Sequence, residues 1–326
     1  VGANKNSIKI IGDNTDMYAQ AYFDYDSKKS GGVTMSHLRF GHKPIKSTYL
    51  IHKANFVACH NPSYVRKYNM VQELVDGGTF LLNCAWNAEE LEKHLPGQVK
   101  KFIAEHNINF YTIDGVKIGI ETGMGPTRIN TILQSAFFSL AKIMPEEDAI
   151  RYMKEKATAS YLKKGQDVVD MNHKAIDAGA TAFVKVDVPE SWKTAEDKAD
   201  KKVYTGREKT VEMVKTILDP VDKMDGDSLP VSAFVDHADG TFELGASAYE
   251  KRGVSAFVPE WTAETCAQCN QCAFVCSHAT IRPFCLTADE AANAPESTKL
   301  ADTKPKASEY KFTMAVSPLD CMGCGV

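Results

Sequence analysis

The sequence lacks any apolar segment long enough to span a membrane. Of its 326 residues, 44% are hydrophobic and 25% charged, and no apolar run approaches the roughly 20 residues that a membrane helix needs. The net charge of -4 lacks the strong excess of one sign that favours nucleic acid or anionic membranes. The residues after Val1 lack the charged and apolar pattern of a secretion signal. We therefore expect a globular cytoplasmic protein without membrane or nucleic-acid partners; in a eukaryote it could instead occupy a hydrogenosome or similar organelle.

A starting methionine is also missing, and the chain stops at Cys324-Gly-Val326, directly after two closely spaced cysteines. We expect both ends to be cuts within a longer protein. No internal repeat of 20–50 residues is visible, which argues against a solenoid or propeller. The length predicts about two domains.

Nine cysteines need an explanation in a protein of this kind. Disulfides are typical of small secreted scaffolds, and the size and the missing signal both argue against them here. Six of the cysteines fall into two tight groups near the C-terminus. The other three, Cys59, Cys84 and Cys285, are expected to be small buried hydrophobic residues.

Residues 1 to about 188 alternate between strand-length apolar runs and helical periods, which predicts an α/β domain with a sheet covered by helices. Asn87 and Glu90 form a capping-box pattern before one of the helices. The expected strands are 8–11, 49–59, 79–84, 110–121 with a turn at 114–115, and 183–188. The expected helices follow residues 87 and 96 and cover 126–144, 146–164 and 166–178. The stretch from Trp192 to Lys209, rich in Lys, Asp, Glu and Thr, is expected to be a solvated connector.

The first cysteine group has the spacing C-x2-C-x2-C-x3-C, formed by Cys266, Cys269, Cys272 and Cys276. This is the pattern of one half of a bacterial-type ferredoxin, in which three thiolates bind one [4Fe–4S] cluster and the fourth reaches the other cluster. A zinc site usually pairs two C-x2-C groups across a longer span, so it fits these four cysteines poorly. Serine at position 277 replaces the usual proline but leaves the cysteine spacing intact.

The second group, Cys321 and Cys324, looks like the opening of the other ferredoxin half. The pattern requires a further cysteine just past Val326 and another beyond it. Because the fourth ligands cross between the halves, we expect both cluster ligand sets to be incomplete in this chain.

Several segments resemble pyruvate:ferredoxin (flavodoxin) oxidoreductases across essentially the whole chain. The N-terminal part is similar to the γ domain of that family in Asn4-Lys-Asn-Ser-Ile-Lys-Ile-Ile-Gly12, Tyr25-Asp-Ser-Lys-Lys-Ser-Gly-Gly32 and Ser36-His-Leu-Arg-Phe-Gly41. Tyr249-Glu-Lys-Arg-Gly253 resembles the Glu-Lys-Arg domain that follows, and Cys269-Asn-Gln-Cys272-Ala-Phe-Val-Cys276 resembles the inserted ferredoxin domain. The resemblance implies a γ-type α/β domain at 1–210, a small Glu-Lys-Arg domain at 211–258 and a truncated α+β ferredoxin-like domain at 259–326.

The resemblance also implies the reaction of the parent enzyme. Pyruvate and coenzyme A give acetyl-CoA and carbon dioxide, with electrons passed through [4Fe–4S] clusters to ferredoxin or flavodoxin. Thiamine diphosphate and Mg²⁺ belong to parts of the family that this chain lacks, and we expect the chain alone to be inactive, with no catalytic residue of its own. A homodimer is expected. A stand-alone iron–sulfur electron-transfer module and a related 2-oxoacid oxidoreductase remain alternatives.

Two segments are candidates for contacting the phosphates of coenzyme A. Lys28, Lys29, Ser30, Gly31 and Gly32 combine cations, hydroxyls and flexible backbone, which favours anions; the alternative is a solvated hairpin turn.

Arg128 and Asn130 belong to the second candidate and precede an expected helix, where backbone N–H groups also favour anions. The alternative there is an ordinary turn between a strand and a helix, with a surface arginine.

Overall fold

The computed structural model describes residues 2–26, 31–197, 203–303 and 307–325. The chain divides into two compact units. The first contains the described residues up to Val203 except Gly31, and the second contains Gly31 and the described residues from Tyr204 onward. The expected boundaries at 210 and 258 stay predictions.

The first unit begins with a helix, α1 (Gly2–Asn14), where a strand was expected at residues 8–11. That expectation was wrong because the buried positions Ser7, Ile10 and Ile11 follow helical spacing, i, i+3 and i+4. The side chains of Asn14 and Thr15 donate to the carbonyls of Ile10 and Ile11 at 2.8 and 2.6 Å. These bonds satisfy acceptors that the end of a helix leaves open.

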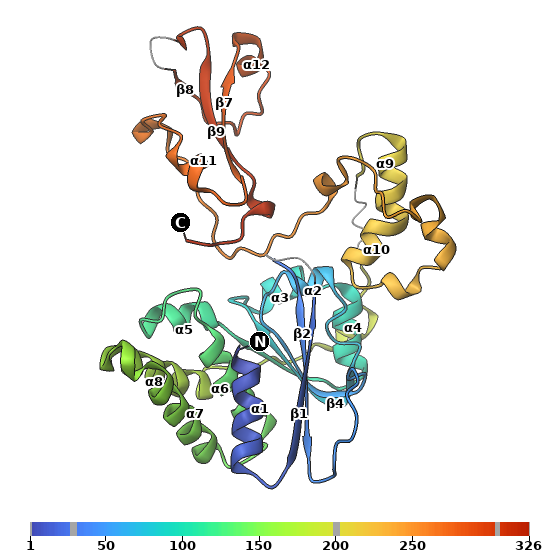
Figure 1. Cartoon of the computed structure of the whole chain (residues 1–326), viewed down its shortest axis with the longest axis vertical. Coiled ribbons are helices and arrows are strands. Elements are labelled where there is room, and N and C mark those ends of the chain that lie inside the picture. Colours follow the sequence, from blue (N-terminus) through green and yellow to red (C-terminus); the bar gives the residue numbers. More distant parts are fainter. Residues whose placement is uncertain (1, 27–30, 198–202, 304–306, 326) are drawn as a thin grey trace. The chain divides into compact units, whose positions relative to one another are not determined.

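Strands β1 (Tyr18–Tyr25) and β2 (Thr34–Gly41) form an antiparallel hairpin beside α1 (Figure 1). Tyr18 faces Gly41 and Tyr25 faces Thr34 in its register. These paired strands flank the candidate segment at 28–32, of which residues 28–30 lie outside the described residues.

A four-stranded sheet in the order β3-β4-β5-β6 forms the centre of the unit. Its strands are β3 (Ala54–Cys59), β4 (Leu74–Asn83), β5 (Asn109–Ile113) and β6 (Val184–Lys185). The first three run parallel, and β6 returns antiparallel to β5. The predicted α/β class is confirmed, with a mixed sheet. Residues 115–121 were expected to extend a strand, but they form helix α5 because Asp114 caps a helix there, accepting from Lys117 N–H at 2.9 Å.

Helices cover both faces of this sheet (Figure 1). On one side lie α3 (Ala88–His94) and α4 (Gly97–Glu105), with the short α2 (Tyr64–Lys67). On the other lie α5 (Gly115–Glu121), α6 (Asn130–Ala141) and α8 (Gln166–Thr181), and α7 (Glu146–Tyr161) packs on α8 and α6. The predicted capping box of Asn87 and Glu90 is present at α3. Helix α6 begins at Asn130, later than the expected residue 126, and it ends before the expected residue 144 because Lys142 adopts a left-handed conformation.

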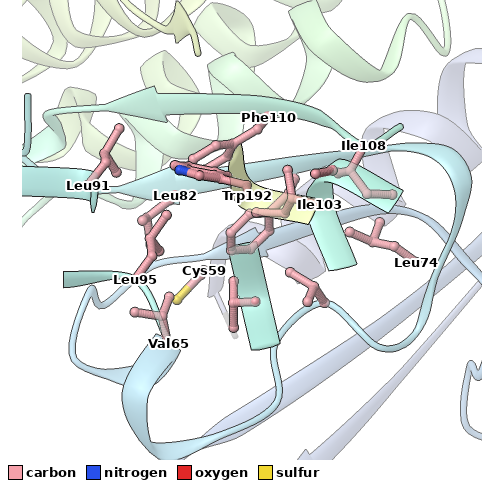
Figure 2. Packing of buried hydrophobic residues seen from close by; sticks show 14 of the residues in the cluster. Cys59, Val65, Leu74, Leu82, Leu91, Leu95, Ile103, Ile108, Phe110 and Trp192 are labelled. Atoms are coloured by element: carbon pink, nitrogen blue, oxygen red, sulfur yellow. The ribbon is translucent and has the colours of Figure 1, made fainter. Parts of the chain in front are cut away.

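The main apolar core lies between the sheet and the helices α3 and α4 (Figure 2). Trp192, in the short 3-10 turn Glu190–Thr194, is 2% exposed and belongs to this core, near the ring of Phe110. The expectation of a solvated connector was wrong at this residue. The residues around Trp192 are mostly polar, so the local sequence pattern does not reveal that this aromatic side chain is buried.

Cys59 and Cys84 are buried, as predicted, whereas Cys285 is exposed on its strand. Burial raises the pKa of Cys59 to about 12 and that of Cys84 to about 11. Both thiols therefore stay protonated and unreactive at neutral pH. The prediction for Cys285 was wrong: its strand turns four of its six residues to solvent, and position 285 is one of them.

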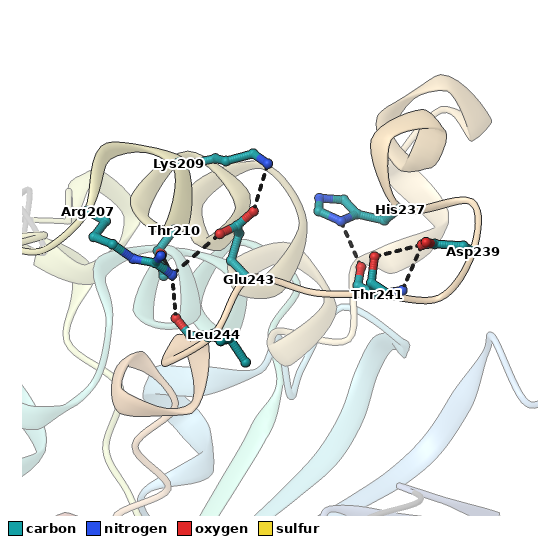
Figure 3. Close-up of polar contacts among 8 residues, drawn as sticks. All are labelled: Arg207, Lys209, Thr210, His237, Asp239, Thr241, Glu243 and Leu244. Carbon is teal, nitrogen blue, oxygen red and sulfur yellow. Dashed lines mark hydrogen bonds and ion pairs between the residues drawn. The ribbon is translucent and has the colours of Figure 1, made fainter.

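The second unit opens with α9 (Glu208–Met213), a π-helical turn (Val214–Leu218) and α10 (Asp219–Asp222). Short 3-10 turns follow at Gly226–Ser228, Val231–His237 and Ala246–Tyr249. Glu243 joins this segment by accepting from Lys209 at 3.1 Å and Arg207 at 3.5 Å, and Arg207 also donates to the Leu244 carbonyl at 3.0 Å (Figure 3). These bonds add to a small apolar cluster, in which Met213, Val214 and Ile217 are the buried members among the described residues.

The C-terminal part of this unit contains an antiparallel sheet in the order β7-β9-β8. Its elements are α11 (Gln271–Val275), β7 (Ile281–Leu286), α12 (Ala288–Ala292), β8 (Ala301–Asp302), β9 (Lys311–Val316) and a last 3-10 turn (Pro318–Asp320). Among the described residues of the whole chain, no helix is both long and apolar enough to cross a membrane.

Candidate functional site

The first cysteine loop curls tightly between a 3-10 turn at Ala263–Thr265 and α11. Gln268, between Cys266 and Cys269, has a φ of 56°, and Asn270, before Cys272, has a φ of 60°. Left-handed backbone is uncommon for residues other than glycine. Where left-handed residues alternate with right-handed ones, successive backbone N–H groups point toward a common concave side, as at many iron–sulfur sites.

Hydrogen bonds already reach two of the sulfur atoms. The N–H of Gln268 donates to Cys266 Sγ at 3.3 Å, and that of Thr280 donates to Cys276 Sγ at 3.3 Å. The hydroxyl of Thr280 lies 3.2 Å from the same Cys276 sulfur, and this contact is the main cause that lowers the Cys276 pKa to about 7. A lowered pKa favours the thiolate, which is the form that binds metals.

The second cysteine loop follows the 3-10 turn Pro318–Asp320. Cys321 is 8% exposed and Cys324 is exposed. Gly323, between them, has a φ of 65°, and Gly325 has a φ of 80°. The second loop therefore also bends through left-handed residues, here glycines that adopt them without strain.

The described residues contain no group of three or more His, Cys, Asp or Glu side chains placed to hold one metal ion. The six cysteines thus lie in two loops with suitable donor atoms and curvature, but their sulfurs do not converge. All nine cysteines are free. The donor atoms and the left-handed turns of the two loops are of a kind that iron–sulfur sites use, but the described sulfur atoms are not gathered around one point.

Of the first phosphate candidate, Lys28, Lys29 and Ser30 lie outside the described residues. Gly31 has a φ of 69°, and a Cβ built there would lie 2.6 Å from Met322 Cε and 2.9 Å from Arg252 Cδ. Gly31 therefore lies close to the Glu-Lys-Arg segment and to the second cysteine loop of its own unit. The left-handed backbone at this position favours glycine, whereas the Met322 and Arg252 side chains could move aside. Gly32 follows directly and is partly buried.

The second phosphate candidate occupies the loop that leads into α6. Arg128 is exposed two residues before the helix, and Asn130 is its exposed first residue. The loop turns through Gly123 and Gly125, with φ of 83° and 81°. This geometry is compatible with both the anion-binding and the plain turn alternatives.

Lys251 and Asp320 form an ion pair at 2.6 Å that the sequence motifs did not predict. They lie 69 positions apart, so no local pattern reveals the pairing. Two features of the sequence could have drawn attention to these residues. Lys251 lies within Glu250-Lys-Arg-Gly253, and Asp320 immediately precedes Cys321.

Residues 1–182 match the family model described as "Pyruvate ferredoxin/flavodoxin oxidoreductase". The chain belongs to this family. Residues 199–255 match a second model, EKR, described as a domain of unknown function. These matches confirm the resemblance that the sequence motifs indicated.

Relatives in the family match the chain over its full length. A pyruvate-flavodoxin oxidoreductase of Enterobacter agglomerans is 52% identical over 325 residues, covering 100% of this chain and 27% of that protein. A pyruvate:ferredoxin oxidoreductase of Moorella thermoacetica is 50% identical over 326 residues, with the same coverages of 100% and 27%. The chain thus spans about a quarter of the length of these curated relatives.

Among solved structures, the pyruvate oxidoreductase subunit PORC of Thermotoga maritima is similar to this chain. It is 16% identical with a TM-score of 0.44, covering 57% of this chain and 90% of that one.

Proposed function

We propose that this chain is the part of a thiamine-diphosphate-dependent pyruvate:ferredoxin/flavodoxin oxidoreductase that contacts coenzyme A and conducts electrons. The parent reaction is pyruvate plus coenzyme A giving acetyl-CoA, carbon dioxide, a proton and two electrons. The family match and the names of the full-length relatives support this reaction and a ferredoxin or flavodoxin acceptor. Thiamine diphosphate and Mg²⁺ would bind elsewhere in the parent, which we propose to be a homodimer. This chain alone would not turn over pyruvate.

The observation that carries the electron-transfer role is the first cysteine loop, with left-handed Gln268 and Asn270 between ferredoxin-spaced cysteines. Bound [4Fe–4S] clusters would supply one-electron acceptors. Cys266, Cys269 and Cys272 would hold one cluster in a ferredoxin-like fold. Cys276 would join Cys321 and Cys324 at the other. Hydrogen bonds to sulfur from Gln268 and Thr280 would stabilise the thiolates and tune the reduction potentials.

Anaerobic reconstitution with iron and sulfide tests this role. This chain alone should hold far less than two [4Fe–4S] clusters, and what forms should be labile, because each set lacks a thiolate. Extending the chain through the next two cysteines of the pattern should restore both clusters, read as iron, acid-labile sulfide and electron paramagnetic resonance.

Within the extended chain, Cys272→Ser should remove one cluster. Cys285→Ser is the matched control, because Cys285 is an equally exposed, free cysteine outside the motif; it should leave the iron content unchanged. Two fully loaded clusters in the unextended chain, or equal iron loss in both variants, would contradict the ligand assignment.

For coenzyme A, we propose that Lys28, Lys29, Ser30, Gly31 and Gly32 contact a phosphate group. Arg128 and Asn130 would contribute a second anion contact. Hydrogen bonds to charged groups contribute about 1.5–3 kcal/mol each. Replacing both lysines of the first segment by alanine in the complete enzyme should therefore raise the KM for coenzyme A at least about tenfold, with pyruvate little affected.

The exposed pair Lys163 and Lys164, in the 3-10 turn that follows α7, supplies the matched double-alanine control. An unchanged KM for coenzyme A in the Lys28/Lys29 variant would leave the first segment as a hairpin turn only.

A further inference from the structure

The Glu-Lys-Arg segment, Glu250–Gly253, touches the residues that lead into the second cysteine loop. Lys251 Nζ lies 2.6 Å from Asp320 Oδ2. The N–H of Gly253 donates to the Leu319 carbonyl at 2.8 Å. One side-chain bond and one backbone bond thus fix two consecutive residues directly before Cys321.

The turn that receives these bonds is itself ordered by local hydrogen bonds. Ser317 Oγ donates to Asp320 Oδ2 at 2.6 Å, and the Asp320 N–H donates to the Ser317 carbonyl at 3.2 Å. The Cys321 N–H donates to the Pro318 carbonyl at 3.3 Å. These bonds couple the position of the Asp320 side chain to the backbone that leads into Cys321.

Two left-handed glycines lie at this contact, each against a side chain of the other segment. Gly253 has a φ of 53°, and a Cβ there would lie 3.2 Å from Leu319 Cδ2. Gly323, inside the cysteine loop, has a φ of 65°, and a Cβ there would lie 2.7 Å from Ser255 Oγ. The contact thus extends on both sides of Cys321, before it at Leu319 and after it at Gly323.

The ion pair is suited to positioning more than to electrostatic tuning. The side chains of Lys251 and Asp320 are 40% and 29% exposed, so both are partly shielded from water. Opposite charges 2.6 Å apart largely cancel for a group farther away. The ion pair therefore affects the cysteine loop mainly by fixing the position of Asp320, and less through its electric field.

We propose that Glu250–Gly253 is a clamp that positions the second cysteine loop for an iron–sulfur cluster, with Lys251 and Gly253 as the positioning residues. This gives a role to the segment whose family model is described as a domain of unknown function. The inference rests on the proposed electron-transfer function.

The test compares Lys251→Met with Lys299→Met in the complete protein. Lys299 forms an ion pair with Glu260 at 2.6 Å in the same unit and also donates to the Trp261 carbonyl at 3.3 Å. Both partners precede the first cysteine loop, so Lys299 is a matched control for effects on the second loop. Without metal, amide hydrogen exchange in 319–325 should become about three- to tenfold faster in Lys251→Met only. Lys251→Arg, which keeps the cation, should restore most of the protection.

With iron bound, a chelator should remove iron from the cluster of Cys321 and Cys324 faster by a similar factor in Lys251→Met. The other cluster should lose iron at the unsubstituted rate. Circular dichroism of both methionine variants should match the parent protein.

Two outcomes separate the clamp from the function on which it rests. Equal exchange and equal iron loss in Lys251→Met and Lys299→Met overturn the clamp while leaving the proposed function intact. Failure of the unsubstituted protein to bind iron overturns the proposed function, and with it any role of the clamp at a cluster.

Discussion

Replacing Trp192 by alanine should destabilise the first unit by about 3–5 kcal/mol, the usual cost of deleting a buried aromatic side chain. The indole is 2% exposed and packs in the core between the sheet and α4, 6.3 Å from the ring of Phe110. Alanine would leave a cavity there because the surrounding side chains belong to regular elements that cannot collapse freely. A far-UV circular dichroism urea titration would report the loss as a lower midpoint with little change in slope.

The hydrogen bond of this tryptophan can be separated from its packing. Trp192 Nε1 donates to Glu92 Oε2 at 2.5 Å, and Glu92 also accepts from Lys100 Nζ at 2.6 Å. Because Glu92 keeps a partner when the indole is removed, the bond itself should contribute only about 0.5–1.5 kcal/mol. Trp192→Phe, which keeps most of the apolar volume, should therefore cost clearly less than Trp192→Ala.

Lys193→Ala serves as the control for both changes, because Lys193 is the exposed neighbour in the same turn and contacts only Glu190 among the pairs described there. It should shift the free energy of unfolding by less than about 0.5 kcal/mol. If Trp192→Ala unfolds at the same urea concentration as Lys193→Ala, the connector is solvated after all and the core assignment is wrong.

Three further predictions concern an ion pair, the accessibility of the cysteines and a helix cap. Hydrogen bonding from Lys100 is the main cause that lowers the Glu92 pKa below its usual 4.5, against an opposing effect of burial and with help from Trp192. The stabilisation that ionised Glu92 provides is complete above its unfolded-state pKa and is lost as the pH falls through its folded-state pKa. Glu92→Gln removes this group, so the urea midpoint of the variant should fall less steeply with decreasing pH below about pH 4.5. Iodoacetamide should label Cys285 in the native metal-free chain and spare Cys59, whose pKa burial raises to about 12; equal labelling in mass spectra would mean that the core opens readily. Asn87→Ala should cost about 1 kcal/mol by removing the cap of α3, and Asn87→Ser should restore most of it, as read from the same titrations.

Local sequence determined the elements whose signals are short-range. The capping box at Asn87 and Glu90 predicted the start of α3, because both of its hydrogen bonds join residues three apart. The expected strands at 79–84 and at the start of 110–121 were visible as short apolar runs, since a parallel strand is buried on both faces; the part of the second run after the turn at 114–115 forms helix α5 instead. The cysteine spacing named the candidate ligands, and the motifs named the family, which the family match confirmed.

Tertiary structure decided what depends on distant partners. Ile10 and Ile11 read as a strand locally, but the helix α6 and its neighbours bury them on one face of a helix. Trp192 lies in a polar segment, and its apolar environment comes from the sheet and from α4, which are distant in the sequence. The clamp joins residue 251 to residue 320. Sequence patterns carry information over a few residues, whereas such contacts form only after loops of tens of residues have closed, so the fold itself had to bring these groups together.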